Sequence, residues 1–146
     1  MIYLRSISKV KYEEFDEIWL IVRSLGKAAH MLSRPNVRHM PDLSPTKELF
    51  YAYLNWKKAG QWNASCFEQN YVPQFLREGQ ANPYFIQNMV ELQELDKAGK
   101  KIALVCFCPE EDLCHRSIVG ALSAINDISV EKPDVIAKYV ERYFPK

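Results

Sequence analysis

Residues 106–117 of this chain, CFCPEEDLCHRS, bring thiols, an imidazole and a guanidinium together in one short segment. Three of the four cysteines lie here, followed directly by a histidine and an arginine: Cys106, Cys108, Cys114, His115 and Arg116. A thiolate is a strong nucleophile, and an imidazole can accept or return its proton. The segment therefore predicts a chemical site rather than a fold held together by disulfides.

The position of Cys114 favours a reactive thiol. The acidic turn before it and the apolar residues after it predict a helix that starts near Leu113, and a helix start favours negative charge. A thiol at such a place, beside His115 and Arg116, has a lowered pKa. We expect Cys106 or Cys114 to be the nucleophile and His115 to act as acid or base.

The same segment can bind an anion. The Arg116 guanidinium offers two parallel hydrogen bonds to a phosphate or carboxylate, and the unpaired N–H groups of a helix start point to the same place. We therefore expect Arg116 and Ser117 to contact a ligand. The acidic residues 110–112 oppose a strongly anionic pocket unless they point outward.

Two other interpretations of the cysteines stay open. The spacing C-x-C-x5-C-H offers four ligands for a metal, although it matches no common zinc motif, and adjacent Cys114 and His115 would have trouble reaching one ion. Alternatively, the cysteines are small core residues that pack where a strand meets a helix. The sequence assigns no metal ligand and identifies no cofactor.

Two continuous apolar runs position this segment. Residues 18–22 (IWLIV) and 101–107 (KIALVCF) are typical of strands buried on both faces. Arg23 and Ser24 follow the first run, as the cysteines follow the second. Parallel strands would bring both ends to the edge of the sheet where ligands bind, so we expect Arg23 and Ser24 to contact the ligand as well.

The rest of the chain predicts an α/β fold: one domain over residues 1–146, with a mostly parallel sheet of about three to five strands flanked by helices. Short strands are expected at 2–4 and 128–130. Helices are expected at 44–60 (capped by Ser44, with Pro45 at its first position), 66–77 with a bend at Pro73, 82–99, 113–125 and 135–143. Residues 24–46, rich in glycine and proline, are expected to form a long loop.

Composition restricts the function. With 146 residues, 48% of them hydrophobic, and a net charge of +1, the chain is neither disordered nor a strongly basic nucleic-acid coat. No apolar run is long enough for a membrane span, and the N-terminus lacks a secretory leader. We expect a cytoplasmic protein with reduced cysteines and no membrane partner.

The segment also resembles a known family. Cys106, seven residues, and then Cys-His-Arg-Ser at 114–117 is similar to the pattern of the family called domain of unknown function 488, as is the earlier strand end LIVRS at 20–24. The resemblance covers about residues 18–125 and implies a compact α/β domain of prokaryotic or phage origin. The N-terminal strand departs from the family's pattern, because its usual histidine is absent.

These observations favour a ligand site for an anion or a nucleotide at the strand ends, with cysteine- or histidine-assisted chemistry. Its partner would be a phosphate-bearing small molecule or nucleic acid, which rests on the two arginines. The alternatives are a binding module without catalysis, for nucleic acid or protein, and a fold stabilised by a metal at the cysteine cluster. Substrate, reaction type and oligomeric state do not follow from the sequence.

Overall fold

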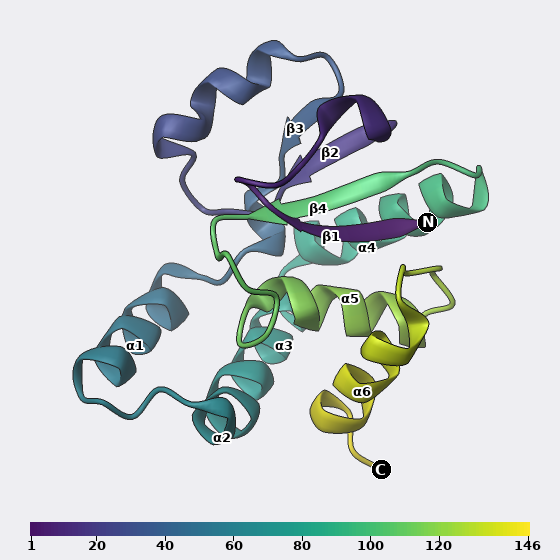
Figure 1. Ribbon diagram of the computed structural model, residues 1–146. Helices are drawn as coiled ribbons and strands as arrows, with labels where there is room; N and C mark the ends of the chain where they lie inside the picture. Colours follow the sequence, from purple (N-terminus) through teal and green to yellow (C-terminus); the bar gives the residue numbers. More distant parts are fainter.

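A computed structural model describes all residues 1–146, and its chain alternates between strands and helices (Figure 1). The strands are β1 (Ile2–Ser6), β2 (Glu17–Leu20), β3 (Val37–His39) and β4 (Ile102–Cys106). The α-helices are α1 (Lys47–Lys58), α2 (Ala64–Cys66), α3 (Val72–Gln80), α4 (Pro83–Lys97), α5 (His115–Ile125) and α6 (Pro133–Tyr143). Short 3-10 helices lie at Tyr12–Glu14, Gly26–Ser33 and Pro41–Leu43.

The four strands form one parallel sheet in the order β1-β4-β2-β3, which confirms the predicted fold class. The central strand β4 is buried along its whole length, as its continuous apolar sequence predicts. Ser6 pairs with Cys106, and Leu20 pairs with Val105. The carboxyl ends of β1, β2 and β4 therefore lie side by side.

Helices cover one face of the sheet. Helix α5 packs against β1 and β4, and α4 packs against β4. Figure 1 shows these helices on one side of the sheet and the 3-10 helix Gly26–Ser33 on the other, with α1 and α2 extending away from the sheet. None of the helices combines the length and apolarity that a membrane crossing needs.

The stretch 24–46 is more ordered than its glycine and proline content predicts. It contains the 3-10 helix Gly26–Ser33 and the edge strand β3, and the residue pattern does not predict that strand. Strand β3 has only three residues and no apolar alternation, so its pattern does not distinguish it from a loop. It forms because its backbone pairs with the free edge of β2, with Val37 beside Ile18 and His39 beside Leu20.

Three predicted boundaries are wrong. Helix α1 is capped by Thr46, whose hydroxyl accepts the Leu49 N–H at 3.2 Å, so neither Ser44 nor Pro45 has the predicted position. Helix α5 begins at His115, because Leu113 has a φ of 59° that no right-handed helix accommodates. Segment 128–130 is no strand and makes only a bridge between Val130 and Ile2.

The predicted bend near Pro73 takes the form of a wide turn. Helices α2 and α3 are joined by a π-helix over Phe67–Tyr71, in which the Val72 N–H bonds the Phe67 carbonyl. Pro73 has no N–H to donate, and the wider turn accommodates its ring. The result is that Tyr71 stands above the carboxyl edge of the sheet, where it lines the cavity described below.

Candidate functional site

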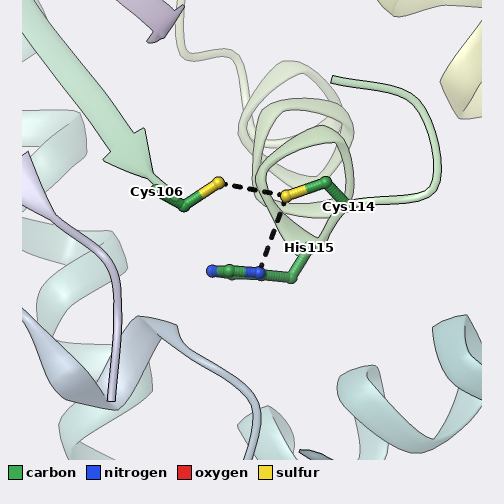
Figure 2. A group of neighbouring side chains, drawn as sticks. All are labelled: Cys106, Cys114 and His115. Atoms are coloured by element: carbon green, nitrogen blue, oxygen red, sulfur yellow. Dashed lines mark hydrogen bonds between the residues drawn. The ribbon is translucent and has the colours of Figure 1, made fainter. Parts of the chain in front are cut away.

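The sulfur atoms of two cysteines meet where β4 ends and α5 begins. Cys106 is the last residue of β4, and Cys114 is the residue that caps α5. Figure 2 shows their side chains pointing at each other, with 3.1 Å between the Sγ atoms. Both are free thiols, 1% and 3% exposed. Residues 107–113 thus form a loop that leaves the end of β4 and brings Cys114 back beside it.

His115 faces the same sulfurs as a proton acceptor. Its Nε2 lies 2.6 Å from the Ile21 carbonyl oxygen, which can only accept, so Nε2 carries the ring proton. Its Nδ1 therefore holds a lone pair, 3.8 Å from Cys114 Sγ (Figure 2). Burial lowers the pKa of His115, although the Ile21 hydrogen bond opposes that shift, and the ring is neutral near pH 7.

Cys108 is the third sulfur of the cluster and the most accessible one. It is half-buried and lines the cavity described below together with Cys106 and Cys114. These two neighbouring thiols hold the pKa of Cys108 far below its usual range, and the nearby His115 and Arg116 act in the same direction. The pKa values of Cys106 and Cys114 are raised, since a second thiolate beside the first is disfavoured. The three sulfurs therefore share one ionisation, which falls to Cys108.

Arg116 is a buried cation without an acidic partner. It is 2% exposed, its Nη1 donates to the Arg5 carbonyl at 2.7 Å, and its buried Nε has no hydrogen-bond partner. A buried charge without a counter-ion is costly. The shared thiolate offers the compensating charge, and Arg116 lowers the pKa of Cys106 and Cys108 through space.

Ser117 has a structural position behind the cluster. Its hydroxyl donates to the Cys114 carbonyl at 2.8 Å, and the Tyr143 hydroxyl lies 2.9 Å from the same oxygen. Both serine contacts are internal, and they tie the start of α5 to the end of α6. Another pair of contacts holds the acidic turn, because the Tyr139 hydroxyl of α6 lies 2.7 Å from both Glu111 and Asp112.

A cavity of about 520 Å³ opens onto the sulfur cluster. Its polar lining comes from the strand ends and α1, and includes Arg23, Ser24, Lys47, Cys108 and His115. Its apolar lining includes Phe50 and Tyr51 of α1, Tyr71, and Phe107 after β4. Two cations and no carboxylate thus surround a largely aromatic space.

Several of these groups are free to meet a ligand. Phe50, Tyr51 and Phe107 are 42%, 53% and 47% exposed, although each is a large apolar or aromatic side chain. Arg23 makes one hydrogen bond, from Nη1 to the Pro45 carbonyl at 3.2 Å, and so retains four of its five N–H donors. These donors and rings form the outer part of the cavity.

The structure brings together five of the seven residues that the sequence predicts for the site. Arg23, Ser24, Cys106, Cys114 and His115 line the cavity, whereas Arg116 and Ser117 lie behind it. Cys108 belongs to the predicted cysteine segment, but the sequence favours Cys106 or Cys114 as the nucleophile. Lys47 and the aromatic residues of α1 are not predicted from the sequence. No local pattern marks these, because only the tertiary fold brings α1 to the sheet edge.

Several other basic and aromatic side chains lie away from the cavity. Arg38 pairs with Glu17 and Glu91, and His39 Nε2 bonds the Val22 carbonyl at 2.7 Å. Trp56 and Trp62 stack on each other with ring centroids 6.1 Å apart, so they pack helices together rather than face the cavity. None of these residues lines it.

The cluster also has donor atoms that a thiophilic metal could use. One donor atom each from Cys106, Cys114 and His115 lies within 4.8 Å of the others. The expectation that adjacent Cys114 and His115 would have trouble reaching one ion is thus wrong, because the cap conformation of Cys114 turns both side chains to one point. Binding of a metal there stays a prediction.

Comparisons with known proteins give one match. A family model described as the active DUF488-N3 subclade, DUF488-N3a, matches residues 2–126. The match includes the sheet, the cavity residues and α5. No curated protein and no solved structure matches the chain.

Proposed function

The chain belongs to the DUF488-N3a family, and we propose that it is a cysteine-dependent enzyme for a ligand of the nucleotide class. The observation that carries this proposal is the meeting of a thiolate cluster and a neutral histidine with a cavity of aromatic rings and two cations. The family's description as an active subclade supports a catalytic interpretation.

The cavity wall favours a planar ring that carries a negative group. Exposed aromatic side chains bind nucleobases by stacking, and each stacked base contributes about 1–3 kcal/mol. Arg23 and Lys47 supply positive charge at the same wall, and no carboxylate lines the cavity to oppose a phosphate. A volume of about 520 Å³ is also in the range of small-ligand sites.

The sulfur cluster supplies the chemistry at the inner end. The Cys108 thiolate faces the cavity and attacks an electrophilic atom of the bound ligand; the bond from that atom to its leaving group breaks, and the leaving group departs with a proton. Cys106 and Cys114 stabilise the thiolate from beside it, and His115 Nδ1 accepts or returns a proton through Cys114. In this arrangement Arg116 stabilises the thiolate from behind instead of contacting the ligand.

Ligand binding is tested by titrating nucleoside monophosphates and their phosphate-free nucleosides into the protein, with short single-stranded oligonucleotides as a further arm. We expect Arg23→Ala and Lys47→Ala each to weaken nucleotide binding by about tenfold, the loss of one charged contact. Lys58→Ala is the matched control, since Lys58 lies on the same helix but outside the cavity. Equal binding of nucleotides and nucleosides would contradict the proposal.

The covalent step is tested with a nucleotide that carries a bromoacetyl group. This reagent should alkylate Cys108 selectively, and unmodified nucleotide should protect it. Cys66→Ser should leave the labelling unchanged, because Cys66 does not line the cavity. Nucleotide binding with no protection of Cys108 would leave a binding module and exclude the enzyme.

A further inference from the structure

We propose that Cys106 and Cys114 are a redox pair, which a hydroperoxide converts into a disulfide that links the end of β4 to the start of α5. In the proposed enzyme Cys106 and Cys114 support the ligand-facing Cys108, a role that does not require their own two sulfur atoms to be in contact. Their geometry is the basis of the inference.

The two sulfurs are already close to bonding distance. Their separation of 3.1 Å compares with about 2.05 Å in a disulfide, so a movement of about 1 Å completes the bond. The two side chains point at each other from opposite sides of the gap between strand and helix (Figure 2). The loop that connects them spans seven residues and includes Cys108.

The surroundings assist the reaction. Both sulfurs line the cavity, which a molecule as small as hydrogen peroxide can enter. The buried Arg116 guanidinium opposes the rise in the pKa of Cys106 and so favours Cys106 as the sulfur that ionises for the attack. The Nδ1 lone pair of His115, 3.8 Å from Cys114 Sγ, can take the proton of that thiol. Cys66, the fourth cysteine, lines no part of this cavity.

The chemistry balances with a hydroperoxide as the oxidant. One sulfur of the pair, as a thiolate, attacks a peroxide oxygen; the O–O bond breaks, one proton is taken up, and water and a sulfenic acid form. The second thiol then attacks the sulfenic sulfur, forms the S–S bond and releases a second water. Overall, two thiols are oxidised by two electrons and one hydrogen peroxide is reduced to two waters.

The disulfide would also regulate the proposed site, an effect that rests on the proposed function. The disulfide closes the seven-residue loop that carries Cys108 and ties both of its ends together. We expect the alkylation of Cys108 by the bromoacetyl nucleotide to fall by at least tenfold in the oxidised protein and to recover with dithiothreitol.

The test treats the reduced full chain with one equivalent of hydrogen peroxide, counts thiols after denaturation and maps disulfides by peptide mass spectrometry. We expect the four thiols to fall to two and the linked peptides to contain Cys106 and Cys114. Cys66→Ser should form the same bond. Cys106→Ser and Cys114→Ser should not, with circular dichroism confirming their fold, and the wild-type map decides the question should either fail to fold.

Four remaining thiols, a link through Cys108, or a link between chains would each overturn the inference. The variant Cys108→Ser shows whether the disulfide forms directly between the two buried cysteines or by way of Cys108. We expect Cys106 and Cys114 to form the bond without Cys108. Nucleotide titration of the reduced protein is read independently. A protein that binds nucleotide but forms no bond contradicts only the redox pair, and one that forms the bond but binds no nucleotide contradicts only the proposed function.

Discussion

The two ends of the parallel sheet treat their polar groups differently. At the amino end, Asp16 accepts the Lys101 N–H at 2.8 Å, and Arg38 lies between Glu17 and Glu91. At the carboxyl end, Arg116 is buried with no acidic partner and an unpaired Nε. Both ends are made by the same strands, so the sheet itself does not cause the difference.

The difference separates structural from functional polarity. Buried polar groups in folded proteins are nearly always paired, and those that are not need another explanation. The amino end satisfies its groups with one another. The carboxyl end gathers a buried cation, a thiolate and a histidine lone pair around a cavity, which is how perturbed groups gather at functional sites.

The largest expected effect comes from removing the Cys108 thiolate at the carboxyl end of the sheet. A thiol with the ordinary pKa of about 8.5 is less than about 1% ionised at pH 6, whereas the lowered pKa of Cys108 keeps it a thiolate there. Cys108→Ser should therefore remove at least about 99% of the iodoacetamide reaction at pH 6. Peptide mass spectrometry after timed quenching measures the loss, with Cys66→Ser as the control. A persistent reaction at another cysteine would assign the thiolate elsewhere.

A second variant removes the buried cation. Arg116→Gln should raise the pKa at which Cys108 ionises by about one unit, equivalent to about 1.4 kcal/mol. Arg116→Lys should reverse part of this shift, because it keeps the charge and loses the planar fork. The full pH profile of alkylation separates a shifted pKa from a packing defect. An unchanged profile in both variants would show that Arg116 does not hold the thiolate.

The sequence reveals the carboxyl end more readily than it reveals the cavity. The apolar runs that lead to Arg23 and Cys106 predict the edge of a parallel sheet, because a strand that is buried on both faces is apolar at every position. Lys47 and Phe50 could not be found this way. They lie on a helix whose own pattern is ordinary, and only the tertiary fold brings them to the cavity at that edge.

The role of Arg116 also lay beyond the sequence. An arginine at a helix start beside a cysteine fits a ligand contact as well as it fits a buried counter-charge. The decision depends on the side chain's direction, and here it reaches the Arg5 carbonyl of β1. Strand β3 escaped prediction for a related reason, since its three residues gain their structure from β2 rather than from their own pattern.

A third prediction concerns pH and His115. Because burial lowers its pKa, the folded protein keeps His115 neutral at pH values where the unfolded chain, with a pKa of about 6.5, takes up a proton. The unfolded state then binds more protons, so the free energy of unfolding falls as the pH drops below about 6.5, by up to about 1.4 kcal/mol per pH unit. This loss should continue until the pH reaches the folded pKa.

His115→Gln removes the titrating ring and retains an N–H group for the Ile21 carbonyl, so its unfolding free energy should depend less on pH over that range. Urea unfolding over about three pH units, from about pH 4.5 to about pH 7.5, measures the two slopes. His30→Gln is the matched control, since His30 is exposed and remote from the cluster. Equal slopes in all three proteins would mean that His115 is not held neutral by the fold.

The smallest expected effect tests the amino end. Arg38, Glu17 and Glu91 are 41%, 24% and 37% exposed, and ion pairs in contact with water stabilise a fold by less than about 1 kcal/mol. Arg38→Gln should lower the unfolding free energy by no more than that, and the difference should shrink in about 1 M salt, where the screening length is about 3 Å. The pH profile of Cys108 alkylation should match that of the wild type, because the charge that stabilises the thiolate is that of Arg116. A shift comparable with that of Arg116→Gln would mean that the two ends are electrostatically coupled, and pairing at one end could then no longer be separated from chemistry at the other.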